Sequence, residues 1–179
     1  MKRVTKIIGC IIAIALIATA CKKENKTGTL TVRMVDQPIP YEQVNVEVEF
    51  VQVHFNNTDN GAEGWVDLET NKGIYNLLDL QNGVSAVLVD GEVLPVGYLS
   101  QLRLVLGDDN TVVIAGITYP LALSSQDKNG LKINLDTTIH DGDDVEIIFD
   151  FDTEKSIVVE GNGTYRLKPV LHLESVEFL

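Results

Sequence analysis

Alternating apolar and polar residues, in short runs separated by turn-forming residues, constrain the fold of this chain more than any other feature. In residues 29–35, Leu30, Val32 and Met34 share one parity. Side chains on a strand alternate between the two faces of the sheet, so this run predicts a strand with one buried face. Further strands are predicted at 44–55, 65–68, 98–106, 111–115, 117–121, 131–135, 145–151, 156–159, 165–167 and 170–178.

Turn residues between these runs have the chemistry that hairpins need. Asn129-Gly130 and Asp141-Gly142 are pairs that tolerate positive φ, and similar clusters separate the other runs. Many short strands with such turns favour a sandwich or a barrel. We therefore predict an all-β fold with a single antiparallel β-sandwich, Greek-key or prealbumin-like, in which residues 73–89 could add one short helical turn.

The predicted strand at 44–55 contains a change of phase. Val44, Val46, Val48 and Phe50 share one parity, whereas the apolar residues from Val51 onward share the other. Both sets can face one core only if an extra residue is inserted near Phe50 and Val51. The sequence predicts a β-bulge there, or a strand that bends from one sheet to another.

The first 21 residues have the pattern of a lipoprotein signal peptide. A basic start (Lys2, Arg3, Lys6) precedes an apolar run at 7–18, and small residues lead directly into Cys21. The apolar run is short of the roughly 20 residues of a membrane-spanning helix. We expect a leader at 1–20, a lipidated Cys21 as the membrane anchor, a polar tether at 21–27, and one β-sandwich domain at 28–179.

Cysteine content and charge exclude several classes. Cys10 lies in the leader and Cys21 would carry the lipid, so no thiol remains for a disulfide, a metal site or a nucleophile. The net charge is −12, and it becomes −15 without the three basic residues of the leader. Such an acidic domain would repel phosphate backbones, so nucleic-acid binding is not expected.

Several phrases of the mature chain occur together in one family. They are Gly28-Thr29-Leu30, Met34-Val35-Asp36, Gly64-Trp65-Val66, residues 75–83, residues 94–98, residues 101–104, Asp150-Phe151-Asp152, Lys155-Ser156 and residues 161–170. Over about residues 28–172 the chain resembles the domain of unknown function family 4382, found mainly in lipoproteins of Bacteroidota. The resemblance implies an envelope β-sandwich and supplies neither an activity nor catalytic residues.

Asp150 and Asp152 flank Phe151 on a predicted strand, so their side chains share a face. Two readings follow. Together with Asp36, Arg103 and Lys155 they could form a structural ion-pair network, which we favour because buried charges are normally paired. Alternatively, a pair of carboxylates could hydrolyse polysaccharide as acid and base.

Other candidate sites are weaker. The acidic turns around Asp108 and Asp143 lack the ligand spacing of a calcium loop, and the three histidines are far apart in sequence, so no metal is expected. No cofactor motif is present. Trp65 opens a strand, where it could either lie at the edge of the core or form part of a ligand-binding surface.

We expect a non-enzymatic protein that binds or scaffolds in the cell envelope, with a glycan or a partner protein as its ligand. The anchor on Cys21 would hold it to the outer membrane, because no Asp follows this cysteine as an inner-membrane retention signal. The bacterial group of this family uses a short acidic signal after the lipidated cysteine to send lipoproteins to the cell surface. Lys23-Glu24 supplies one acidic residue at this position, which favours the cell surface over the periplasmic face.

Overall fold

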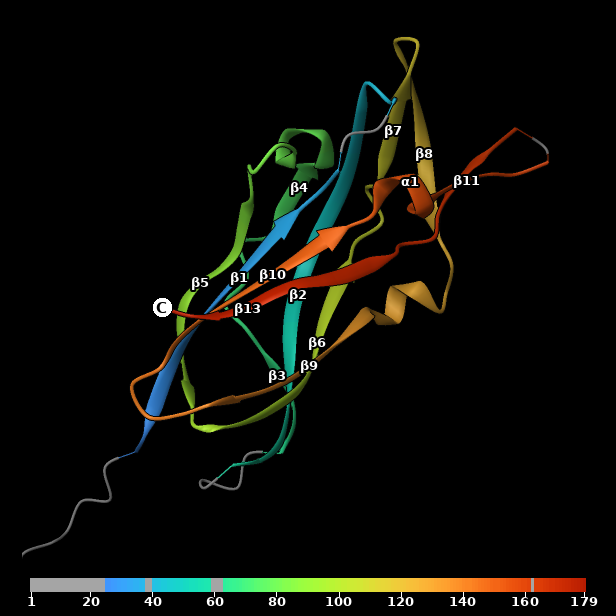
Figure 1. Ribbon diagram of the computed structural model, residues 1–179. Coiled ribbons are helices and arrows are strands. Elements are labelled where there is room, and N and C mark those ends of the chain that lie inside the picture. Colours follow the sequence, from blue (N-terminus) through green and yellow to red (C-terminus); the bar gives the residue numbers. More distant parts are fainter. Residues whose placement is uncertain (1–24, 38–39, 59–62, 162) are drawn as a thin grey trace, which may run out of the picture.

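The computed structural model describes residues 25–37, 40–58, 63–161 and 163–179, and these form two β-sheets packed face to face (Figure 1). The predicted leader and Cys21 lie outside the described residues. Strands dominate and the helical segments are short, which confirms the predicted all-β, sandwich-like fold. The first strand begins at Thr27, one residue before the predicted start of the domain.

The smaller sheet has four strands in the order β13-β10-β1-β5. Its strands are β1 (Thr27–Val35), β5 (Ala86–Pro95), β10 (Asp144–Phe151) and β13 (Leu171–Phe178). In Figure 1 its strands β1, β10 and β13 cross in front of the long strand β2 of the other sheet.

The larger sheet is built around β2 (Gln43–Thr58). Its order is β11-β12-β8-β7-β2-β6-β9, and β3 and β4 also pair with β2. The remaining strands are β3 (Gly64–Asp67), β4 (Gly73–Asn76), β6 (Gly97–Leu106), β7 (Thr111–Ile114), β8 (Ile117–Leu123), β9 (Leu131–Ile139), β11 (Ile157–Val159) and β12 (Tyr165–Leu167).

Both sheets are mixed, so the prediction of a purely antiparallel sandwich was wrong. β1 pairs with β10 in parallel, and β12 pairs with β8 in parallel. The first pairing follows from the turn after β9, because the Thr29 amide donates to the Asp143 carbonyl (2.9 Å) and Thr29 is paired with Asp144. The start of β10 is thereby placed beside the start of β1, and the two strands run in one direction.

The core lies between the sheets and is formed by the apolar parity of each strand. Leu30, Val32 and Met34 of β1 are fully buried, as their alternation predicts. β10 contributes Val145, Ile147, Phe149 and Phe151 to the same core. Burial of this apolar surface is the main source of stability for a domain without disulfides.

The change of phase in β2 is a β-bulge, as predicted. The register between β2 and β6 shifts between Val48 and Phe50. Val48 and Val51 are both buried, whereas Phe50 is 37 % exposed. The assignment of Phe50 to the buried parity was therefore wrong, because the bulge at Glu49 turns the Phe50 ring outward beneath the Lys72 ammonium (3.6 Å from the ring centroid).

Short helical segments lie at the ends of the sandwich. A 3₁₀ helix, η1 (Leu77–Leu80), occupies part of the region predicted to allow a helical turn, and a second one, η2 (Asp127–Asn129), precedes β9. The α-helical turn α1 (Thr153–Ser156) joins β10 to β11. The first polar site described next surrounds this last segment.

Candidate functional site

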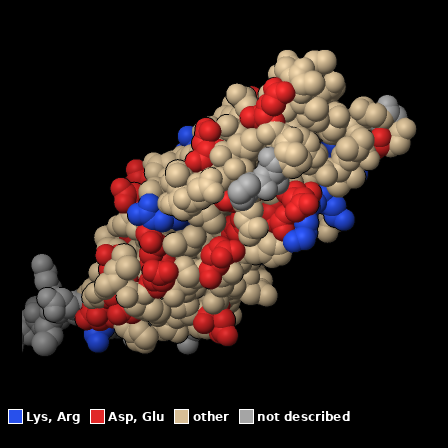
Figure 2. All heavy atoms as spheres, turned by 45° about the horizontal axis from the view of Figure 1, so that its top comes forward, with Lys and Arg blue, Asp and Glu red and all other residues tan. Residues whose placement is uncertain are grey.

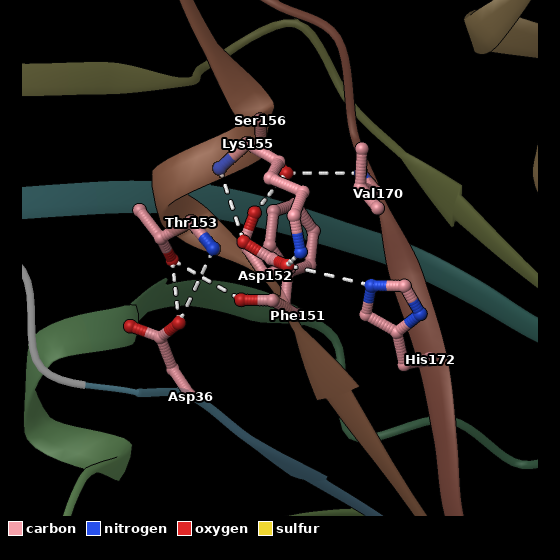
Figure 3. A network of polar contacts seen from close by, with 8 residues as sticks. All are labelled: Asp36, Phe151, Asp152, Thr153, Lys155, Ser156, Val170 and His172. Atoms are coloured by element: carbon pink, nitrogen blue, oxygen red, sulfur yellow. Dashed lines mark hydrogen bonds and ion pairs between the residues drawn. The ribbon is translucent and has the colours of Figure 1, made fainter.

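The first polar site lies beside α1, where β1 and β10 end and β13 begins. Asp152 follows β10 and caps α1, since its Oδ1 accepts a hydrogen bond from the Lys155 amide (3.0 Å). Its Oδ2 accepts from Lys155 Nζ (2.5 Å) and lies 3.4 Å from His172 Nε2 of β13 (Figure 3). Asp is a preferred helix N-cap, so Asp-Thr-Glu-Lys after a strand explains this local structure.

Two further contacts hold α1 in place. The Ser156 hydroxyl donates to the Asp152 carbonyl (2.6 Å) and accepts from the Val170 amide (2.9 Å), which ties α1 to the start of β13 (Figure 3). Asp36, at the end of β1, accepts at Oδ1 from the Thr153 hydroxyl (2.8 Å) and amide (3.3 Å). The carboxylates of Asp36 and Asp152 thus both hold α1 through hydrogen bonds.

These side chains line a cavity of about 190 Å³. Its charged and titratable lining residues are Asp36, Asp150, Asp152, Glu154, Lys155, His172 and Glu174. Acidic side chains are also scattered over the face seen in Figure 2, with fewer basic ones among them. The cavity is therefore an acidic recess of an already acidic molecule.

Asp150 is the least compensated group in this cavity. Only 2 % of it is exposed, and among the described residues its Oδ1 has no hydrogen-bond partner. Burial raises the pKa of Asp150 to about 6, and the negative charges of Asp36, Glu174 and Asp152 add to the shift. His172, which is paired with Asp150 in the register of β10 and β13, acts in the opposite direction.

The neighbouring carboxyls differ from Asp150. Burial raises the pKa of Asp36, although hydrogen bonds from Thr153, Gln37 and Gln81 lower it in part. Burial would also raise the pKa of Asp152, but the hydrogen bonds from Lys155 outweigh burial and lower it overall. Asp152 is thus an ionised structural carboxylate, whereas Asp150 retains its proton to a higher pH.

The predicted ion-pair network comes together only in part. Asp36, Asp150, Asp152 and Lys155 meet at this cavity, but the only ion pair among them is Asp152–Lys155. Arg103 lies in the other sheet, on β6, where its Nη1 donates to the Gln52 Oε1 (3.0 Å). His172 and Glu174 were missed, because the sequence does not show that β13 pairs with β10.

The second polar site surrounds Trp65 on the outer face of the larger sheet. Trp65 of β3 is paired with His54 of β2, which alternates with the buried residues Val53 and Phe55. Directly paired residues point to the same side of a sheet, so Trp65 faces away from the core. The His54 ring meets the indole edge-on, with the ring centroids 5.0 Å apart.

Two cations also contact the indole. The Arg103 guanidinium carbon lies 3.7 Å from the ring centroid of Trp65, and Lys132 Nζ lies 5.3 Å from it. Among the described residues neither cation makes an ion pair. The indole is therefore held on a polar face by a cation–π contact rather than by the core.

Next to Trp65 lies an open groove of about 540 Å³ across β2, β6 and β9. Its lining side chains are His54, Asn56, Tyr98, Ser100, Gln101, Asn134 and Asp136. Tyr98 donates its hydroxyl proton to Asp136 Oδ1 (2.6 Å), and Gln101 Nε2 donates to Asn134 Oδ1 (3.0 Å). The sequence did not reveal this groove, since its residues become neighbours only through strand pairing.

The acidic turns and the histidines have local partners. Asp108 pairs with Lys128, and Asp143 accepts from the His140 amide (2.8 Å). Within the part of the chain that the structure describes, no group of three or more His, Cys, Asp or Glu side chains is placed to hold a metal ion. The same residues contain no helix long and apolar enough to cross a membrane.

Comparison with known proteins identifies a family without assigning an activity. Neither the curated proteins nor the solved structures contain a match to this chain. The family described as "Domain of unknown function (DUF4382)" matches residues 27–169, from the first residue of β1 to the segment before β13. This match confirms the resemblance that the sequence phrases predict, and the chain belongs to this family.

Proposed function

We propose that the protein is an outer-membrane-anchored lipoprotein that binds glycans on the outer face of its larger sheet without cleaving them. The observation that carries this proposal is the position of Trp65, which lies outside the core beside a groove of polar side chains. A large aromatic side chain on an outer face adds little to the core, and its place beside a groove of polar side chains supports a role in ligand binding.

The chemistry of the groove suits a sugar better than an apolar ligand. The C–H groups on one face of a sugar ring pack on an aromatic side chain, while its hydroxyls exchange hydrogen bonds with amides and carboxylates. Trp65 could supply the ring, and Gln101, Asn134 and Asp136 could supply donors and acceptors. A partner protein remains the other expected ligand, and the experiment below distinguishes them.

Hydrolysis by Asp150 and Asp152 is the alternative function. The pKa of Asp150 is raised and that of Asp152 is lowered, which is the split that an acid and a base require. However, the two oxygens of Asp152 are occupied by the Lys155 amide, Lys155 Nζ and His172. A carboxylate held in this way is not free to attack a substrate or to activate water, so we favour binding.

A glycan array with the full chain in detergent would test the proposal. We expect Trp65→Ala to abolish binding with an unchanged melting temperature. The matched control is Phe50→Ala, which removes another outward aromatic side chain that contacts a cation. Unchanged glycan binding by Trp65→Ala would contradict the proposal, and release of reducing sugars would favour the hydrolase.

The membrane anchor needs its own test, because it rests on the residues around Cys21 alone. We expect the wild-type protein in the outer-membrane fraction and the Cys21→Ser variant in the soluble fraction. Protease treatment of intact cells, with a periplasmic protein as the control, would then distinguish the cell surface from the periplasmic face. A Cys21→Ser variant that remains in the membrane would refute lipid anchoring.

A further inference from the structure

The cavity beside α1 carries negative charge that the surrounding residues do not neutralise. Among the described residues that line it, Lys155 is the only Lys or Arg, and its ammonium is engaged by Asp152 (2.5 Å). Asp36, Asp150 and Glu174 have no ion-pair partner among the described residues. This excess of carboxylates arises where β1, β10 and β13 come together.

Two carboxylate oxygens at this site are buried and unpartnered. They are Asp150 Oδ1 and Asp36 Oδ2, on residues that are 2 % and 5 % exposed, and neither has a hydrogen-bond partner among the described residues. Buried polar atoms are nearly always hydrogen-bonded, and a buried charge without a partner is costly. Both residues line the cavity, so a donor bound there would lie beside these two carboxyl groups.

We propose that this cavity binds the primary ammonium group of an organic cation, with Asp150 and Asp36 as the accepting carboxylates. An ammonium group presents three N–H donors and one positive charge, which match two unpartnered acceptors in a negative recess. A cavity of about 190 Å³ accommodates such a group with a short alkyl stem. A metal ion fits less well, because no three ligand side chains among the described residues are placed around one point.

The protonation of Asp150 is consistent with this ligand. Burial and the charges of Asp36, Glu174 and Asp152 keep its pKa near 6, while His172 of β13 lowers it. Lys155 and Glu154 of α1 are the other charged groups that line the cavity. A bound ammonium would favour the ionised carboxylate, so its affinity should rise as the pH increases from 5 to 7 and level off above that.

The primary experiment is calorimetric titration of the full chain in detergent with butylammonium, in phosphate buffer without other amines and at constant ionic strength. We expect saturable binding at pH 7.5, weaker binding at pH 5, and no binding of tetramethylammonium, which has no N–H donor. Asp150→Asn should weaken butylammonium binding about tenfold or more, the usual effect of losing a charged hydrogen-bond partner.

Two variants keep this test specific. Asp90→Asn removes an exposed carboxylate of β5 in the same sheet, and it should leave the affinity unchanged. Glu174→Gln removes a lining carboxylate that has no ion pair among the described residues, so it should weaken binding without removing a contact that holds α1. Equal losses in Asp90→Asn and Asp150→Asn would show a general charge effect and overturn the proposal.

A second titration would identify the source of the ammonium group. The peptide acetyl-Gly-Lys-Gly-amide is compared with the same peptide acetylated on its lysine. Tighter binding of the unmodified peptide than of butylammonium points to a lysine of a partner protein, whereas equal binding points to a free amine. Absence of saturable binding by either probe, or binding of calcium in their place, would refute this site. Because the cavity is separate from Trp65, this outcome is independent of glycan binding.

Discussion

Asp150 and Asp152 are two residues apart, yet they have opposite roles. Asp152 caps α1 and accepts hydrogen bonds from Lys155, and these bonds keep its pKa low. Asp150 is buried beside other carboxylates without a partner, and its pKa is high. The prediction that both lie on one strand was wrong for Asp152, because β10 ends at Phe151 and Asp152 caps α1. The difference in pKa could not be read from the sequence either, because it depends on which groups from β1, α1 and β13 face each carboxylate.

Replacement of Asp150 should stabilise the protein at neutral pH. Its pKa in the unfolded chain is near the ordinary value of 3.8, and in the folded protein it is about 6. The folded state therefore binds the Asp150 proton more tightly than the unfolded chain does. The free energy of unfolding consequently falls as the pH rises from about 4 to above 6. We expect Asp150→Asn to raise the free energy of unfolding by up to about 3 kcal/mol at pH 8, and by little at pH 4.

Urea unfolding at both pH values would measure this effect, with Asp90→Asn as the exposed control. An Asp150→Asn protein that is less stable than the wild type at pH 8 would contradict the assignment. It would mean that the ionised carboxylate has a favourable partner in the folded state.

Replacement of Asp152 should have the opposite effect. Asp152→Ala removes the N-cap of α1 and the acceptor of Lys155 and His172. We expect a loss of about 1–2 kcal/mol, most of it from the cap, since the Lys155 side chain is largely exposed. Thermal unfolding would measure the loss, and an unchanged melting temperature would show that α1 does not depend on its cap.

At the scale of elements, most strands were predictable, whereas β4 and β5 were not. The alternation in 29–35 and 145–151 corresponds to β1 and β10 because one face of each strand is buried. β5 was missed, since Asp90-Gly91 looks like a turn but lies inside the strand. Gly91 has a φ of 57°, and the β1–β5 register shifts nearby. A glycine that permits a bulge therefore looks, in sequence, like one that ends a strand.

The hairpin between β7 and β8 allows a test of turn chemistry. Its two loop residues, Ala115 and Gly116, have φ angles of 49° and 74°. A hairpin turn with both angles positive favours Asn-Gly, and alanine is strained in this conformation. We expect Ala115→Asn to raise the free energy of unfolding by about 1 kcal/mol.

The matched control in that hairpin is Gly116→Ala, which should destabilise the protein by a similar amount because it adds a Cβ at positive φ. Chemical unfolding would compare both variants with the wild type. Destabilisation by Ala115→Asn would show that Ala115 has a contact worth more than its backbone strain.

At the scale of the whole molecule, the domain extends beyond the family match. The match ends at residue 169, but β13 pairs with β10 from Leu171 to Phe178. A chain that ends at 169 would expose an edge of β10 and remove His172 and Glu174 from the acidic cavity. We expect such a chain to aggregate or to unfold without a cooperative transition.

Expression and thermal unfolding of chains ending at 169 and at 178 would test this prediction. The longer chain retains β13 and loses only the exposed Leu179, so it should behave as the full chain does. A cooperative transition in the shorter chain would show that β13 is dispensable for folding.

The central position of β1 has a mechanical consequence. β1 is the strand that follows the predicted tether, and it lies between β10 and β5. Tension applied through the chain before Thr27 would act along β1 and load its ladders to both neighbours in shear. Bonds loaded in shear must break together, whereas bonds at a peeled edge break one at a time. With the proposed lipid anchor, a domain held through its first strand in this way would transmit force from the anchor to a bound ligand without unravelling.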